Sequence, residues 1–192
     1  MALARFLFAM LGLWLLAGIP HVQAASPDFG ILEDADWQAV SHSPGIMVGG
    51  KSKTAIQVVF DPNCPASARL HEYLIKTQAT TAIRWVPVAY YRKNSLGKAA
   101  ALLQAADPEQ ALNQNFENYD YRTQMGAIEP ISPTKDFKLR LAALKVRLDR
   151  WIGATPLMIV RTPGGQVLMN DLGNRAEHIN RLIELADGLK AY

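Results

Sequence analysis

Thiol and imidazole groups are scarce in this sequence, which has one cysteine and four histidines in 192 residues. Cys64 cannot form a disulfide within the chain, and one cysteine with four scattered histidines does not provide the ligands of a zinc site. A dithiol redox enzyme carries a second cysteine three positions after the first, and here Ser67 stands at that position. The sequence therefore leaves open the chemistry of a single thiol and predicts neither a metal nor another cofactor.

A strong charge of one sign is also absent. Of the 20 lysines and arginines only Arg5 lies in the first 24 residues, so the rest of the chain has 19 basic and 17 acidic side chains, a net charge of +2. This balance, without a long run of lysine and arginine, argues against nucleic acid as a partner. No nucleotide-binding loop, carboxylate pair or Ser/His/Asp spacing stands out.

Residues 1–24 have the layout of a secretory signal peptide. Arg5 precedes an apolar run over residues 6–16, which a Gly/Pro pair and the small residues of "VQA" follow. The run is shorter than the roughly 20 residues that span a bilayer, which favours cleavage after Ala24 over an uncleaved anchor. Nothing after residue 25 has membrane-spanning character. We therefore predict an exported protein.

The exported chain is predicted to hold one folded domain. Residues 25–50 are polar and contain glycine and proline, so we expect a loosely ordered lead-in ahead of a domain over residues 51–192. The few apolar side chains of the lead-in that could dock on the domain are Trp37, Ile46 and Val48.

Two strands are predicted from apolar runs rich in β-branched and aromatic residues. Residues 54–60 are typical of a strand that is buried on both faces. Residues 82–91 predict a second strand, which contains Pro87. Because a proline cannot donate to the hydrogen-bond ladder, we place this strand toward the edge of the sheet.

The remaining patterns are helical, apart from one hairpin. A helix is predicted from Cys64 onward, because Pro65 suits the first helical position. A helical insert over residues 95–152 follows, then a hairpin around "RTPGG" and an amphipathic helix over 174–190. The order β–α–β, insert, β–β–α predicts an α/β fold with a central mixed sheet and flanking helices.

Two positions in this order have chemical consequences. Cys64 stands at the start of a helix directly after a buried strand, where unpaired N–H groups and the helix dipole favour an anion such as a thiolate. Thr155 and Pro156 immediately precede a later strand, and Pro156 is a candidate for a cis peptide bond, which is accessible mainly at proline.

Together these segments resemble a known fold and family. "VVFDPNCPAS", "GATPLMIV" and "GGQVLMNDLGN", followed by a last helix, look like the thioredoxin fold, and more narrowly like the DsbC/DsbG family of periplasmic disulfide isomerases. The resemblance covers residues 52–190 and includes the helical insert. Its two motifs, D-P-x-C-P and the cis-proline element, are matched by Asp61, Pro62, Cys64 and Pro65 and by Thr155 and Pro156.

The resemblance implies roles for individual residues. In that family the first cysteine is the exposed nucleophile that attacks a substrate disulfide, and Cys64 stands at its position. The loop before the cis-proline pairs with the substrate backbone, so the expected substrate-binding residues are Thr155, Pro156 and Pro65. The expected substrates are exported proteins with cysteines or disulfides, and the expected location is the periplasm.

Two departures from the family pattern refine this expectation. Ser67 replaces the resolving cysteine, so the chain cannot store an internal disulfide, although a hydrogen bond from Ser67 to the sulfur would favour the thiolate. A single thiolate still forms a mixed disulfide, which a substrate thiol, glutathione or a membrane reductase would resolve. The family's N-terminal dimerisation module is missing or reduced to residues 25–50, so we expect a monomer.

Two other functions are compatible with the sequence. Cys64 is an inert buried cysteine if the domain is a catalytically inactive scaffold that binds an extended peptide of an exported partner or assembly machine. A copper-handling thioredoxin-fold protein is the third interpretation, against which the missing second cysteine counts.

Asp61 and His71 are two candidate partners of the Cys64 thiol. We expect Asp61 to serve the turn. His71 follows seven residues after Cys64, about 10 Å along a helix axis, and is predicted to be a surface residue without a bond to the sulfur.

Overall fold

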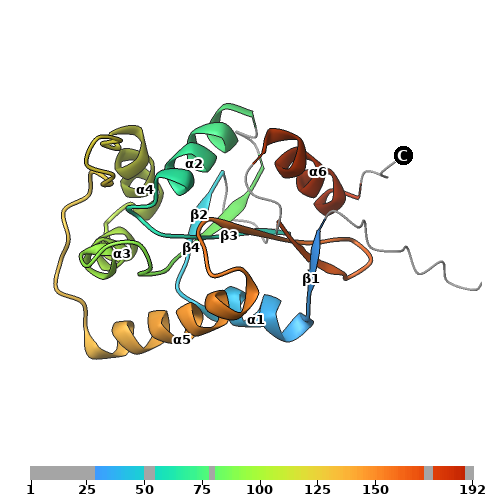
Figure 1. Ribbon diagram of the computed structural model, residues 1–192, viewed down its shortest axis with the longest axis horizontal. Coiled ribbons are helices and arrows are strands. Elements are labelled where there is room, and N and C mark those ends of the chain that lie inside the picture. Colours follow the sequence, from blue (N-terminus) through green and yellow to red (C-terminus); the bar gives the residue numbers. More distant parts are fainter. Residues whose placement is uncertain (1–28, 50–54, 78–80, 171–174, 189–192) are drawn as a thin grey trace, which may run out of the picture.

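A six-stranded mixed sheet with helices on both faces forms the centre of the protein (Figure 1). The computed structural model describes residues 29–49, 55–77, 81–170 and 175–188, and the predicted signal peptide lies outside these ranges. The strand order is β1-β6-β5-β3-β4-β2. No helix in the described part of the chain combines the length and apolar character needed to cross a membrane.

The elements follow the predicted order, with two strands and a helix added at the N-terminal side. The strands are β1 (Gly30–Leu32), β2 (Ile46–Val48), β3 (Ile56–Phe60), β4 (Ile83–Pro87), β5 (Leu157–Arg161) and β6 (Val167–Met169). The helices are α1 (Asp34–His42), α2 (Pro65–Thr77), α3 (Ser95–Gln104), α4 (Pro108–Glu117), α5 (Lys135–Trp151) and α6 (Ala176–Ala186). The helices α3, α4 and α5 follow β4 and precede β5 in the sequence, where the helical insert was predicted.

Strand β3 is the centre of the sheet, and all five of its residues are buried. It runs parallel to β4 and antiparallel to β5. Its side chains alternate between two cores, with Val58 and Phe60 on one side and Val59 on the other. The prediction of a strand buried on both faces is therefore confirmed.

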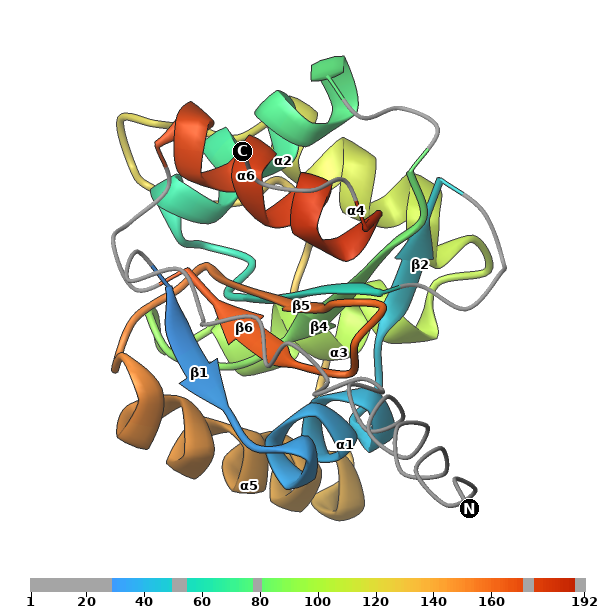
Figure 2. The same ribbon diagram turned by 90° about the vertical axis from the view of Figure 1, so that its right-hand side faces the viewer.

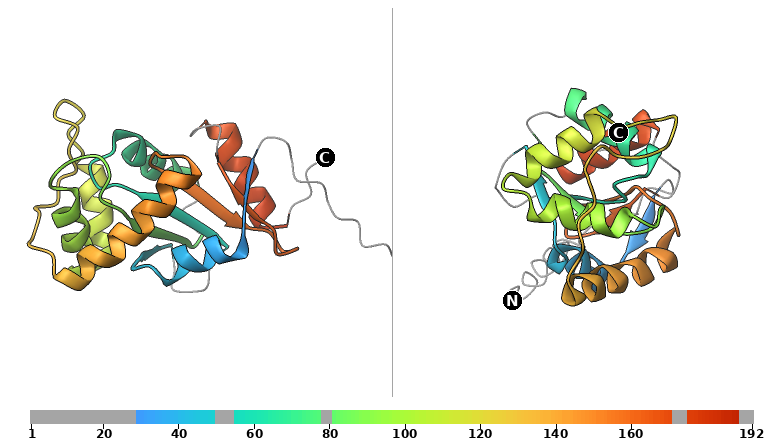
Figure 3. Two further views of the ribbon diagram at one scale, coloured as in Figure 1. Left: turned by 60° about the horizontal axis from the view of Figure 1, so that its bottom comes forward. Right: turned by 90° about the vertical axis from the view of Figure 1, so that its left-hand side faces the viewer.

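The two faces of the sheet are covered by different helices (Figure 2). Helices α2, α4 and α6 pack on one face through a large core that includes Leu70, Leu112 and Leu182. Helices α1 and α5 pack on the other face, where Val40 and Leu148 are fully buried. Figure 3 shows α3 and α4 at one end of the molecule, and β1 with the turn of the β5–β6 hairpin at the other.

The prediction of a loosely ordered lead-in over residues 25–50 is wrong for the part that the structure describes. Strand β1 pairs with β6, β2 pairs with β4, and α1 packs between them against the second core. Pairing at both edges of the sheet satisfies backbone groups of this polar segment. The expected apolar contacts, Trp37, Ile46 and Val48, are buried, so the domain begins well before residue 51.

Strand β4, which contains Pro87, lies toward one edge of the sheet as predicted but not at it, because β2 continues the sheet beyond it. Pro87 is the last residue of β4 and pairs in register with Phe60. The N–H that reaches the Phe60 carbonyl belongs to Val88, at 2.8 Å. On the other side β2 pairs only as far as Trp85, so the missing N–H of Pro87 leaves no gap in the ladder.

Candidate active site at the turn between β3 and α2

Cys64 closes the turn that joins β3 to α2. Its N–H donates to the Asp61 carbonyl at 3.0 Å, and its own carbonyl accepts the N–H of Ala68 at 3.1 Å, which starts the helix. Pro65 is the first helical residue, where an N–H has no intrahelical acceptor and a proline is tolerated. Cys64 is only 5% exposed, so the exposed cysteine that the family resemblance implied is not found.

The Cys64 thiol meets the loop before β5. Its Sγ donates to the carbonyl oxygen of Thr155 at 3.2 Å, a contact between residues 91 positions apart. The peptide bond between Thr155 and Pro156 is cis. The sheet explains the meeting: β3 and β5 are antiparallel neighbours with Val59 opposite Leu157, so the end of β3 and the start of β5 lie at the same edge. Pro156 is buried, whereas Thr155 is partly exposed.

The predicted hydrogen bond from Ser67 to the sulfur is not formed. Ser67 is fully buried on α2, and its hydroxyl has no hydrogen-bond partner among the described residues. The Cys64 thiol is instead hydrogen-bonded to the carbonyl of Thr155, a residue of the loop before β5 and not of α2. Ser67 therefore occupies the position of a second sulfur without replacing its interaction with the first.

The Asp61 carboxylate holds the turn from inside. It is fully buried and accepts four hydrogen bonds, from the N–H groups of Asn63, Tyr90 and Tyr91 at 2.6–2.7 Å and from the Ser95 hydroxyl at 2.8 Å. Burial raises the pKa of Asp61, and these four hydrogen bonds act against that rise. The expectation that Asp61 serves the turn agrees with this geometry.

Asn63 extends the same network into the helical insert. Its side-chain amide donates to Asn94 at 2.9 Å and to Ser95 at 3.0 Å, and its side-chain oxygen accepts the N–H of Gly126 at 3.2 Å. The Tyr119 hydroxyl donates to its backbone carbonyl at 2.6 Å. Sequence reasoning missed these contacts of Asn63, because no local pattern indicates which residues of the insert return to the turn.

A second set of bonds fixes the segment around residues 126–128 behind the turn. The Asn115 amide donates to the Pro62 carbonyl at 3.1 Å, and its oxygen accepts the N–H of Ile128 at 3.1 Å. The buried ammonium of Lys98 donates to the carbonyls of Gly126 and Ile128. An added side chain at Gly126 would meet the Pro62 carbonyl at 2.4 Å, so glycine is required there.

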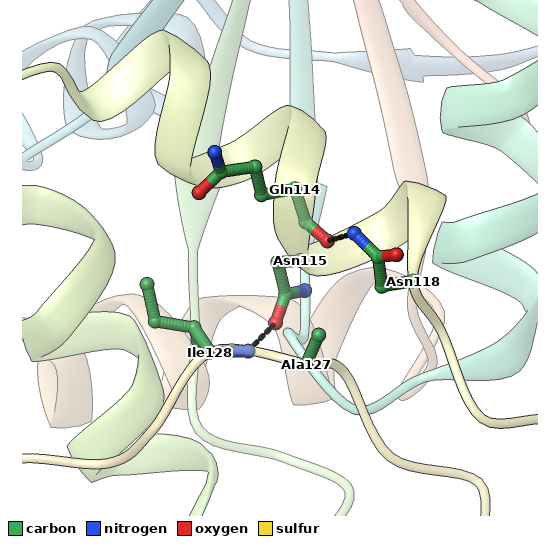
Figure 4. A pocket seen from close by; sticks show the side chains of 5 residues that line it. All are labelled: Gln114, Asn115, Asn118, Ala127 and Ile128. Carbon is green, nitrogen blue, oxygen red and sulfur yellow. Dashed lines mark hydrogen bonds between the residues drawn. The ribbon is translucent and has the colours of Figure 1, made fainter.

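A pocket of about 260 Å³ lies beside this segment, and Cys64 is not among its lining residues (Figure 4). Amide side chains dominate its lining. In Figure 4 the Asn115 oxygen points to the Ile128 N–H, and the Asn118 amide to the backbone of Gln114. The complete lining is Gln114, Asn115, Asn118, Ala127 and Ile128.

The prediction that His71 is a surface residue is wrong. It is 2% exposed, and its ring lies 5.3 Å from the Trp85 ring and 5.1 Å from the Phe116 ring. Its Nε2 is 2.9 Å from the Asn113 side-chain oxygen. Burial lowers the pKa of His71, and Asn113 partly opposes this effect. No hydrogen bond joins His71 to Cys64 in the described structure, so the pairing that the helix spacing disfavoured does not occur.

Comparisons with known proteins establish the class to which this architecture belongs. No protein-family model and no curated protein matches the chain. Among solved structures it is similar to Proteus mirabilis ScsC in a transitional conformation, with 18% identity, a TM-score of 0.56 and coverage of 81% of this chain and 78% of the other. It is similar to the catalytic domain of Proteus mirabilis ScsC with 17% identity, a TM-score of 0.52 and coverage of 81% and 96%.

A periplasmic thioredoxin-like protein from Salmonella enterica serovar Typhimurium is a further structural neighbour, with 13% identity, a TM-score of 0.48 and coverage of 84% of this chain and 100% of the other. At such identities the likeness to the two ScsC structures shows the fold alone, which is the thioredoxin fold that the sequence predicted. Within that fold the chain carries a single cysteine at the turn between β3 and α2.

Proposed function

We propose that this protein is an exported, periplasmic thioredoxin-fold protein that performs monothiol thiol–disulfide exchange on exported protein substrates. The observation on which this proposal rests is the hydrogen bond of 3.2 Å from the Cys64 thiol to the carbonyl of Thr155, the residue before the cis-proline. The signal-peptide pattern of residues 1–24 supports export. The structural likeness to the catalytic domain of Proteus mirabilis ScsC supports a catalytic role.

The reaction begins with attack of the Cys64 thiolate on one sulfur of a substrate disulfide. A bond forms between Cys64 Sγ and that sulfur, the substrate S–S bond breaks, and the second sulfur leaves with the electron pair and takes a proton from water. A thiol of the substrate then attacks the bound substrate sulfur and releases Cys64. The substrate disulfide has been rearranged with no net gain or loss of electrons, so isomerisation needs no second cysteine in the protein.

The surroundings of Cys64 define what substrate binding has to change. In the free protein the thiol is nearly buried and donates to Thr155. A substrate strand that lies along the loop of Thr155 and Pro156, beside Pro65, would compete for the Thr155 carbonyl and release the thiol. Without a resolving thiol at Ser67, the mixed disulfide waits for a thiol of the substrate, glutathione or a membrane reductase.

Adduct formation tests the proposal. The protein is exported with its own leader, purified and reduced, and is then incubated with glutathione disulfide and with a peptide disulfide. The reactions are quenched with acid and the protein mass is measured by mass spectrometry. We expect one adduct on Cys64 in the folded protein and none in Cys64→Ser. The proposal fails if the folded protein forms no adduct while the same protein in urea does, because the thiol is then blocked by the fold.

A catalytically inactive scaffold that binds an extended peptide is the second candidate, and the near-complete burial of Cys64 favours it. The two functions differ in their dependence on the sulfur. In cells that need the protein, Cys64→Ser would abolish the phenotype of an exchange protein and leave that of a scaffold intact. Replacing Thr155 and Pro156 by alanine would abolish both.

A further inference from the structure

Four exposed side chains lie on α2 and on the two chain segments that contact the turn carrying Cys64, and we call them the tyrosine–arginine rim: Arg69, Tyr91, Arg92 and Tyr121. Tyr91 is 40% exposed and Tyr121 is 47% exposed. The guanidinium carbon of Arg92 lies 5.1 Å from the Tyr91 ring centre, and that of Arg69 lies 6.0 Å from the Tyr121 ring centre.

The rim is attached to the residues that immediately precede Cys64. The N–H of Tyr91 donates to the Asp61 carboxylate at 2.7 Å, and the N–H of Arg92 donates to Ser95 at 3.1 Å. On the other side the Tyr121 ring packs on the Tyr119 ring with centres 4.8 Å apart. The Tyr119 hydroxyl in turn bonds to the carbonyl of Asn63.

Tyr119 contacts both the turn and the rim, through the Asn63 carbonyl and through the Tyr121 ring. The pKa of Tyr119 is raised, chiefly by burial and further by the nearby charges of Cys64, Tyr91 and Tyr121, while Arg92 acts in the opposite direction.

The two arginines of the rim form no ion pair within the described part of the chain. The Arg92 guanidinium donates to the carbonyl of Thr123 and to the side-chain oxygen of Gln124. Two nearby acidic side chains make other contacts. Glu72 pairs with Lys76 at 2.7 Å, and Asp120 accepts from the N–H groups of Arg122 and Thr123 and from the Thr123 hydroxyl.

We infer that the tyrosine–arginine rim makes the protein select extended substrate segments with acidic residues next to the reacting cysteine. This inference rests on the proposed exchange function and names its substrate class. Carboxylates of such a segment complement Arg69 and Arg92, and its backbone and apolar side chains lie on the exposed faces of Tyr91 and Tyr121. Because the rim is exposed, its charges act mainly on the rate of encounter and lose their effect in high salt.

A matched peptide series tests this selectivity. Three peptides carry one cysteine in a disulfide with 2-mercaptoethanol, and the cysteine is flanked by two aspartates, two asparagines or two lysines. Attack by Cys64 links the peptide to the protein and releases 2-mercaptoethanol, which takes up a proton. The second-order rate constant of adduct formation is divided by the rate constant with which the neutral thiol N-acetylcysteine amide attacks the same peptide disulfide. This ratio removes differences in the intrinsic reactivity of the three disulfides.

The aspartate peptide is expected to react roughly threefold to tenfold faster than the lysine peptide at low salt, with a ratio near one at high salt. Arg69→Gln and Arg92→Gln should each reduce the ratio. Arg140→Gln, which removes the same charge from an exposed site on α5 across the sheet, should preserve it. Equal rates for the three peptides, or an unchanged ratio in both rim variants, would overturn the inference while the exchange function stands. Failure of the asparagine peptide to react would instead remove the exchange function itself.

Discussion

The two halves of the segment from Asp61 to Ser67 differ in how their buried polar groups are satisfied. In the first half Asp61 and Asn63 are fully buried, and their side chains bond to the chain after β4, to α3 and to the segment at Gly126. In the second half the Cys64 thiol makes one hydrogen bond and the buried Ser67 hydroxyl makes none within the described structure.

The difference separates the residues that hold the turn from Cys64, the proposed nucleophile. A buried polar group costs free energy unless it is hydrogen-bonded, so the network around Asp61 and Asn63 fixes the position of Cys64. The second half contributes little to that rigidity, and the unsatisfied hydroxyl of Ser67 is a local cost. Substitutions in the two halves should therefore change the free energy of unfolding by different amounts and even in opposite directions.

The largest effect is expected for Asp61→Ala. The substitution leaves three backbone N–H groups and the Ser95 hydroxyl without their acceptor in a buried site. We expect the free energy of unfolding, measured by urea denaturation, to fall by about 3 kcal/mol. Asp120→Ala is the matched control, because Asp120 also accepts backbone N–H groups but is exposed. A loss of the same size in both variants would contradict the special role of the buried network.

A pair of serine substitutions compares the two halves directly, because Ser95 and Ser67 are both fully buried. The Ser95 hydroxyl donates to Asp61 and accepts from Asn63, so Ser95→Ala is expected to cost about 1–2 kcal/mol in unfolding free energy. Ser67→Ala removes a hydroxyl that has no partner in the described structure and is expected to be neutral or stabilising by up to about 1 kcal/mol. Equal losses would show that Ser67 is satisfied in solution, for example by water.

The smallest effect is expected for His71, a buried residue on α2. One of its ring nitrogens is hydrogen-bonded to the Asn113 side chain. Burial lowers its pKa in the folded state, so the unfolded chain takes up a proton first as the pH falls below about 6.5. Stability is therefore retained above that pH and lost below it, by about 1 kcal/mol between pH 6.5 and 5.5. Urea denaturation across this range should show a smaller acid loss in His71→Gln, whereas the exposed control His42→Gln should behave as the parent protein.

The main elements of the fold could be predicted because their signals are local. The continuous apolar run that ends at Phe60 predicted the buried strand β3, and Pro65 predicted the start of α2. The errors arose where partners are distant in sequence. The segment before residue 50 was predicted to be loosely ordered because it is polar. It nevertheless forms β1 and β2, because β6 and β4 each offer a free strand edge with which it pairs. His71 was misplaced because α4 covers it, which no pattern within α2 indicates.

The sequence by itself determined that only one thiol is available and that it stands between a buried strand and a helix. It also determined that Thr155 and Pro156 precede a later strand. These features could be read from the sequence because residue identity and periodicity are properties of neighbouring positions. Only the tertiary structure decided that Cys64 is nearly buried, that its proton is directed to the Thr155 carbonyl, and that the buried Ser67 hydroxyl finds no hydrogen-bond partner in the described part of the chain. Those outcomes depend on how β5 and the helical insert pack against β3, and the hydrogen bonds available to a buried group are set by that packing rather than by its neighbours along the chain.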